Sequence, residues 1–207
     1  MLDQETLDRL WKQKDPKLSE ERFRDAAADP AYDADEKAEL ATQLGRAIGL
    51  QGRYEEADAL LDSVDGDEPT VGVRILLERG RVLNSSGHAA MAVPLFEQAA
   101  ELSDHLGEEY LAVDALHMLA IADPTHAGLW TRSALEYAST AHDPHTRRWM
   151  AVLHINLGWS LHGEGRFTEA LVEFQLAEQW AERTGTAAQQ QHASEAIEAC
   201  ELALAAG

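Results

Sequence analysis

Three segments of the chain superpose without gaps, and their shared positions constrain the fold more than any other feature does. They lie within residues 40–64, 76–100 and 154–178, where the first range starts one residue earlier relative to the shared positions than the other two. The shared positions are a glycine (Gly45, Gly80 and Gly158), a second glycine (Gly52, Gly87 and Gly165), an alanine (Ala57, Ala92 and Ala170), a large apolar residue (Leu61, Phe96 and Phe174) and a smaller apolar residue (Val64, Ala99 and Ala177).

Each shared position has a physical reason if every segment is a pair of antiparallel helices. The first glycine and the alanine remove side-chain bulk where the two helices approach most closely. The second glycine permits the left-handed residue that ends the first helix and turns the chain back. The large apolar residue fills the gap against the next pair. Because one pair cannot bury its own apolar face, several pairs must stack.

The rest of the chain also favours helix, because Ala, Leu, Glu and Gln dominate it and no Asn-Gly or Asp-Gly turn separates two alternating runs. The alternation of Leu153, Ile155 and Leu157 resembles a strand, but the repeat identifies this segment as a helix. We expect an all-α chain with helices at 3–14, 18–29, 35–51, 53–64, 70–86, 89–105, 108–122, 127–141, 145–163, 166–184 and 187–205.

Composition narrows the functional class. The 207 residues are enough for one domain, and no apolar run approaches the roughly 18 residues that span a bilayer. The polar N-terminus lacks the apolar core of a secretory signal, and a single cysteine excludes an internal disulfide framework. We therefore expect a soluble cytoplasmic protein.

The net charge of −20 opposes binding to nucleic acid or to an anionic membrane. Two interpretations of this charge are open: it serves only to keep the protein soluble, or it attracts a basic partner. We expect no nucleic-acid and no membrane partner.

The repeat resembles the tetratricopeptide repeat (TPR), whose pattern is W-x2-L-G-x2-Y, then A-x3-F, then A and P. Around Gly158 the chain reads L-G-x2-L and then G-x-F-x2-A-x3-F-x2-A, and Pro69 follows the first copy at the expected place. A poorer copy has Ala120 in place of the first glycine and no turn glycine. Phe23 and Ala26 mark a degenerate half repeat.

The resemblance implies one TPR-like domain over 1–207, built as a right-handed α-α superhelix. Its parts would be N-terminal helices and the half repeat at 1–34, helical pairs at 35–69, 70–106, 107–142 and 145–184, and a C-terminal capping helix at 186–207. In this family the first helix of each pair lines a concave groove. The resemblance thus implies these groove residues: Thr42, Arg46, Arg74, Glu78, Arg81, Asn84, His117, Ile155, Asn156, Trp159 and His162.

Charge along these helices suggests a ligand. Acidic residues gather on the second helices, whereas Arg46, Arg74 and Arg81 would line the groove and could hold a carboxylate or acidic segment. The alternative is that the arginines pair with neighbours, as Arg74 could with Glu78. Trp159 beside Ile155 would be an interface anchor unless a cap helix or a second copy of the protein covers it.

Catalytic and metal chemistry is poorly supported. Residues 158–163 read GWSLHG, one residue too long for a nucleophile elbow around Ser160, and HGEG lacks the lysine of a phosphate loop. Neither the HDPH segment at 142–145 nor His154 with His162 matches a compact zinc pattern. Cys200 is expected to be buried. We expect no cofactor, no metal and no enzymatic activity.

The leading hypothesis is a noncatalytic scaffold that binds a peptide or protein segment in its groove. The alternative is a self-assembling structural protein, such as a homodimer, whose groove holds another copy. A metal-binding protein or enzyme using His117, His154 and His162 is the third interpretation.

Overall fold

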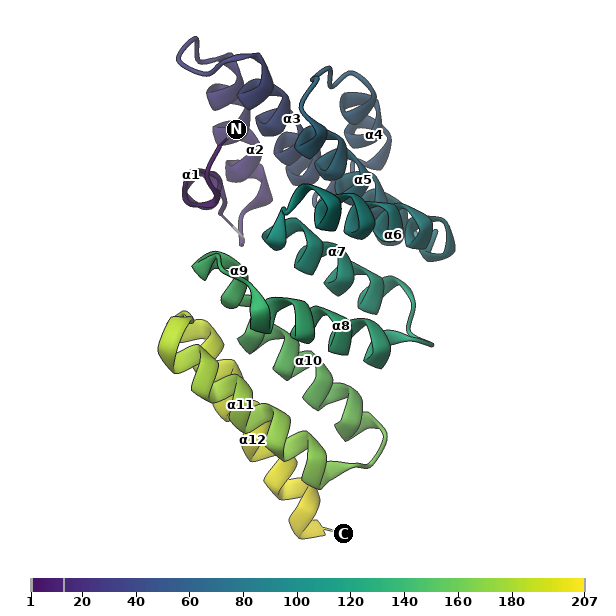
Figure 1. Ribbon diagram of the computed structural model, residues 1–207, viewed down its shortest axis with the longest axis vertical. Coiled ribbons are helices and arrows are strands. Elements are labelled where there is room, and N and C mark those ends of the chain that lie inside the picture. Colours follow the sequence, from purple (N-terminus) through teal and green to yellow (C-terminus); the bar gives the residue numbers. More distant parts are fainter. Residues whose placement is uncertain (1, 13, 207) are drawn as a thin grey trace. The chain divides into compact units, whose positions relative to one another are not determined.

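The computed structural model describes residues 2–12 and 14–206, and every regular element within them is a helix (Figure 1). In chain order the helices are α1 (Gln4–Leu10), α2 (Pro16–Ala28), α3 (Ala34–Gly49), α4 (Tyr54–Asp62), α5 (Pro69–Ser85), α6 (Ala89–Leu106), α7 (Glu109–Ala122), α8 (Ala127–Thr140), α9 (Pro144–Arg147), α10 (Trp149–Gly163), α11 (Phe167–Thr184) and α12 (Ala187–Ala206). The predicted all-α class is confirmed.

One predicted helix, 145–163, is wrong because the chain forms two helices there, α9 and α10, which meet at Arg148. The backbone N–H of Arg148 bonds to the carbonyl of His145, three residues back, at 3.1 Å. This tighter turn interrupts the regular α-helical bonding. The strand-like alternation lies inside α10, where Leu153, Leu157 and Leu161 are buried at a spacing of four residues.

Local sequence signals explain where several helices begin. Asp33 and Glu36 form a reciprocal capping box at the start of α3, in which each side chain accepts from the other residue's backbone N–H. Asp15 caps α2 just before Pro16, and Pro69 begins α5. Proline suits these first positions because the first N–H groups of a helix have no acceptor within it, so no helical hydrogen bond is lost when proline lacks the N–H.

The glycine columns take the predicted roles. Gly52, Gly87 and Gly165 have positive φ angles of 77°, 88° and 76°, which place each of them in the left-handed region between two antiparallel helices. A Cβ at Gly80 would overlap the ring of Phe96, and a Cβ at Gly158 would overlap the ring of Phe174. In these two copies the large apolar residue, Phe96 or Phe174, therefore packs against the first glycine of its own helical pair.

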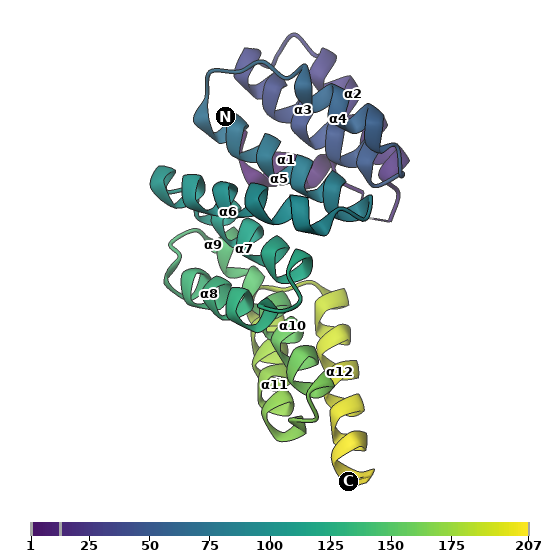
Figure 2. The ribbon, with the colours of Figure 1, turned by 90° about the vertical axis from the view of Figure 1, so that its right-hand side faces the viewer.

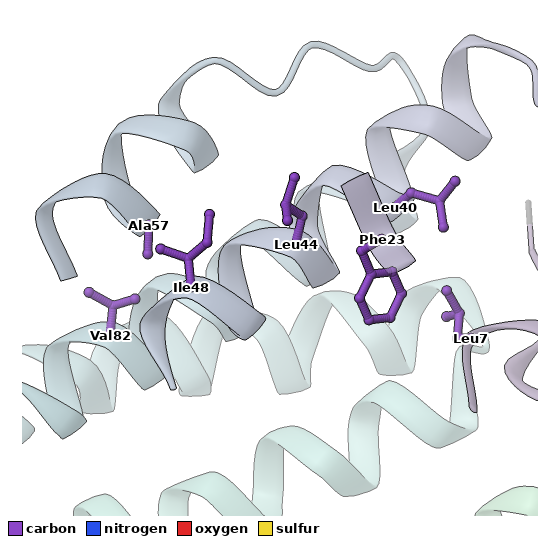
Figure 3. Close-up of a cluster of buried hydrophobic side chains, with 7 residues drawn as sticks. All are labelled: Leu7, Phe23, Leu40, Leu44, Ile48, Ala57 and Val82. Carbon is purple, nitrogen blue, oxygen red and sulfur yellow. The ribbon is translucent and has the colours of Figure 1, made fainter. Parts of the chain in front are cut away.

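Contacts divide the chain into two compact units, Met1–Leu111 and Ala112–Gly207. The prediction of one domain over 1–207 stays a prediction. In the first unit, α3 packs against α2, α4 and α5, and α5 packs against α6. Figure 3 shows part of its core, in which Phe23 lies near Leu7 of α1. The core cluster contains Leu7, Phe23, Leu40, Leu44, Ile48, Ala57 and Val82.

In the second unit, α10 packs against α8 and α11, and α12 runs alongside α11 and α10 (Figure 2). Ala193, Ala196 and Cys200 of α12 are buried, and the latter two join Leu157 and Phe174 in one cluster. The Cys200 Sγ lies 3.1 Å from the carbonyl oxygen of Phe167, and burial raises the pKa of its thiol. The expectation that Cys200 is a buried small residue is confirmed.

Candidate functional site

Two of the predicted groove residues, Arg74 and Glu78, are buried side chains of α5. The Arg74 Nε lies 2.8 Å from the Glu39 Oε1 of α3, and the two side chains are only 9% and 1% exposed. The alignment is not that of a hydrogen bond, so the contact is chiefly ionic. The other Glu39 oxygen accepts the backbone N–H of Leu2 at 2.8 Å. Arg74 is therefore held inside the protein.

Arg81, one turn further along α5, pairs with Glu78. Its Nη1 lies 2.7 Å from the Glu78 Oε1, and the Gln43 Nε2 of α3 lies 3.5 Å from the same oxygen. The Arg81 side chain is 12% exposed. Asn84, on the last turn of α5, is half-buried.

Arg46 contacts the N-terminal segment. Its guanidinium carbon lies 5.1 Å from the centre of the Trp11 ring, and the Trp11 indole N–H donates to the Gln43 Oε1 at 3.1 Å. Thr42 is fully buried and donates its hydroxyl to the Glu39 carbonyl at 2.7 Å. The segment from Leu2 to Trp11 therefore lies against α3 residues predicted to face a ligand.

These contacts change the interpretation of Arg46, Arg74 and Arg81, which were expected to line the groove. All three predicted arginines interact within the protein, as the neighbour-pairing alternative expects, although the partner of Arg74 is Glu39 and not Glu78. The simple segregation of acids outside and arginines inside is wrong, because Glu39 and Glu78 are buried beside the arginines. Burying a charge without a partner is costly, which explains the pairing.

In the second unit, His117 of α7 and Asn156 of α10 lie side by side. The Asn156 Nδ2 is 3.3 Å from the His117 Nδ1, and the His117 ring centre is 5.1 Å from that of Trp149. These two predicted residues thus belong to one polar and aromatic contact between α7 and α10.

Trp159 stands out on α10 because it is a tryptophan that remains 42% exposed. Its ring centre is 5.0 Å from that of Phe174 and 5.3 Å from that of His162, both edge-on. His162 in turn lies 4.9 Å from Phe167. Ile155, one turn before Trp159, is half-buried and packs on the same core cluster. Trp159 remains partly exposed although α12 packs on α10, which disfavours the alternative that a cap helix covers it.

The predicted histidines are held by separate partners. His154 lies with its Nδ1 2.7 Å from the Glu173 Oε2 of α11, whereas His162 contacts the rings of Trp159 and Phe167 edge-on. In the HDPH segment, Asp143 caps α9 by accepting from the backbone N–H groups of His145 and Thr146. Over residues 2–12 and 14–206, no group of three or more His, Cys, Asp or Glu side chains is arranged to hold a metal ion.

Burial would raise the pKa of the Asp143 carboxyl, but its bonds to His145 and Thr146 outweigh burial and lower that pKa. The carboxylate is thus kept ionised as a helix cap.

Sequence reasoning overlooked a repeated arginine at the turn between paired helices. Arg53 precedes α4 and pairs with Glu56, and Arg166 precedes α11 and pairs with Glu169. These bonds raise the arginine pKa values, with Glu20 adding to the effect at Arg53 and Glu164 at Arg166. The signal is a glycine, an arginine and an aromatic residue, with a glutamate three positions after the arginine.

Comparisons with known proteins bear on the fold. No family model matches the chain, and no curated protein matches it. A crystal structure of BtubC (BKLC) from P. vanneervenii is similar, with a TM-score of 0.58 and 16% sequence identity over 97% of this chain and 91% of that chain. A likeness at this identity concerns the fold alone. Among the helices described here, none is long and apolar enough to cross a membrane.

Proposed function

We propose that the protein is a noncatalytic interaction module that binds a peptide or protein segment on the α10 face around Trp159. The observation that carries this proposal is the 42% exposure of the Trp159 side chain. Tryptophan is enriched among the residues that dominate binding energy at protein interfaces, and a large apolar surface left in water is costly.

The packing around Trp159 supports the proposal. Phe174 and His162 contact the indole from the protein side, so the exposed ring is held by neighbours that are themselves packed. A ligand side chain would meet an ordered surface and would lose little further free energy by ordering it. Such a pre-organised aromatic surface suits an apolar or aromatic side chain of a peptide.

The neighbouring residues define the site. Ile155 adds apolar surface one turn before Trp159, and Asn156 and His117 add polar groups on α10 and α7. In this proposal the inner residues of α3 and α5 stabilise the first unit by their mutual pairing. The proposal assigns the ligand contacts to the α10 face. It no longer assigns them to Arg46, Arg74, Glu78, Arg81 and Asn84.

Selection from a displayed library of random peptides tests the proposal. Peptides enriched on the native protein should bind Trp159→Ala at least about thirtyfold more weakly, as expected when an interface anchor is removed. Leu129→Ala is the matched control, because Leu129 is an exposed apolar residue of the same unit, 55% exposed on α8. Equal binding to all three proteins, or an absence of selected peptides, would contradict the proposal.

Self-assembly is a second candidate function, and the end of α12 favours it. Leu202 is 73% exposed and Leu204 is 39% exposed there. Light scattering across a concentration series should show a mass increase that Leu202→Glu abolishes if α12 mediates association. A constant monomer mass would remove this candidate.

A further inference from the structure

A surface pocket of about 820 Å³ lies in the first unit. It is formed by the turn before α4, by α4 and α5, by the turn before α6 and by α6 itself. Its apolar lining includes Val82, Leu83 and Leu95. Val82 also belongs to the core cluster, where it lies beside Ala57 (Figure 3). An apolar group entering the pocket would therefore extend the core of the unit.

A hydrogen bond and two ion pairs connect α4 and α5, which both line the pocket. The Tyr54 hydroxyl, at the start of α4, donates to the carbonyl of Ser85 at the end of α5, at 3.1 Å. Arg79 of α5 faces Asp58 of α4, with its Nε 3.5 Å from the Asp58 Oδ1, and it also pairs with Asp62. These contacts join the two helices beside the pocket, and the pocket is already formed without a ligand, as binding sites commonly are.

The two arginines of the pocket are neutralised. The Arg53 Nη1 lies 2.6 Å from the Glu20 Oε2, and its Nε donates to the Glu56 Oε2 at 2.8 Å. Arg79 likewise faces two carboxylates, those of Asp58 and Asp62. Two acids on each arginine leave little positive field for an anion, so phosphate or carboxylate ligands fit this pocket poorly.

The charge left over in the pocket is negative. Glu55 is an exposed lining residue of α4, and among residues 2–12 and 14–206 its carboxylate has no ion-pair or hydrogen-bond partner. The net charge of −20 adds a long-range attraction for cations and repels a second copy of the chain. Charge complementarity therefore favours a basic partner, with apolar side chains for the Val82 side of the pocket.

We infer that this pocket docks a basic amphipathic segment of a partner protein. An apolar side chain of the segment packs against Val82, Leu83 and Leu95, and a lysine or arginine pairs with Glu55. Its lining residues all belong to the first unit, whereas Trp159 belongs to the second, so variants of the two sites can be tested independently.

The probe is a fluorescently labelled helical peptide that carries leucines on one face and lysines on the other. A second peptide with glutamates in place of the lysines keeps the apolar face. The native protein should bind the lysine peptide and not the glutamate peptide in fluorescence anisotropy. Failure to bind the lysine peptide, or equal binding of both, would overturn the inference.

Matched charge reversals locate the binding. Glu55→Lys should weaken binding of the lysine peptide at least about fivefold, since a nearby attraction becomes a repulsion. Glu97→Lys, at an exposed position of α6 outside the pocket lining, changes the net charge equally and should leave the affinity unchanged. Equal weakening by both reversals would show general charge attraction and would overturn the inference.

Two further variants separate this pocket from the α10 face. Trp159→Ala should retain full binding of the lysine peptide, whereas loss of binding in that variant would assign the peptide to the other site. Ser86→Trp places a bulky ring in the pocket lining and should block the peptide. Circular dichroism verifies that Ser86→Trp is folded, and retained binding by the folded variant would overturn the inference. If it does not fold, the Glu55 and Glu97 pair decides alone.

Discussion

Glu39 of α3 and Arg74 of α5 form a buried ion pair across two helices that the sequence had suggested would face a ligand. The Arg74 Nε and Glu39 Oε1 are 2.8 Å apart, and the two side chains are 9% and 1% exposed. Attraction between these side chains compensates for removing both from water, so loss of either leaves a buried charge.

This pair yields a stability prediction. Glu39→Gln should lower the free energy of unfolding by about 3–5 kcal/mol, because Arg74 then has no opposite charge. The double variant Glu39→Leu with Arg74→Met should lose less than the sum of the two single losses. Urea unfolding of the native protein, Glu39→Leu, Arg74→Met and the double variant measures this coupling, and the same measurement on Glu39→Gln gives its loss. A loss below about 1 kcal/mol for Glu39→Gln would show that the pair is not buried in solution.

The contact between Gly158 and Phe174 gives a second prediction. Gly158→Ala should destabilise the protein by about 1–3 kcal/mol, because its methyl group would overlap the Phe174 ring. Gly163→Ala is the matched control on the same helix, since a Cβ there meets nothing within 4 Å. Thermal unfolding should show a lower midpoint for the first variant only. Similar midpoints for both would contradict the close packing.

Trp11 gives a third prediction. Trp11→Phe removes the indole N–H that donates to Gln43 but keeps a ring for Arg46, and should cost about 1 kcal/mol. Trp11→Ala removes both and should cost more. Hydrogen exchange should then be faster in α1 for Trp11→Ala than for Trp11→Phe. Unchanged exchange in both variants would mean that the segment from Leu2 to Trp11 is not held by Trp11.

Asp123 gives a pH prediction. Hydrogen bonds from Trp130 and then from His126 hold the pKa of this carboxyl below its usual value. Because the folded pKa is lower than the unfolded one, the stabilisation is present above the unfolded value of about 3.9 and is lost as the pH falls through the folded pKa. Carbon-detected NMR should show a titration midpoint below about 3.9.

A variant supplies the control for Asp123. Asp123→Asn keeps an oxygen that can accept from Trp130 but removes the charge. Its stability deficit relative to the native protein should be present at neutral pH and disappear below the folded pKa. A deficit that is constant with pH would contradict a role for the charge.

Much of the fold could be predicted from sequence because its constraints are local. Gly52, Gly87 and Gly165 mark left-handed turns that few other residues adopt, and the repeat places each of them seven residues after a close-packing glycine. The break at Arg148 was missed because no proline or glycine marks it. It depends on a single tighter backbone turn after the Asp143 cap.

The candidate site was less predictable because its contacts join distant residues. Helical spacing places Arg74 near Glu78, but the nearer carboxylate belongs to Glu39, on another helix. Nothing in the local sequence around Trp11 indicates that it contacts Arg46 and Gln43. Trp159 could be singled out because a large aromatic residue occupies a position between the buried Leu157 and Leu161 of α10, but its exposed fraction depends on tertiary packing that helical spacing alone does not reveal.

The most direct test of an interaction surface at Trp159 is site-specific photocross-linking with a library-selected peptide. A benzophenone amino acid is placed at position 159 in one protein and at position 129 in another, and cross-linked products are mapped by mass spectrometry. Our account predicts a peptide adduct from position 159 and none from position 129. Adducts from both positions, or from position 129 alone, would contradict it.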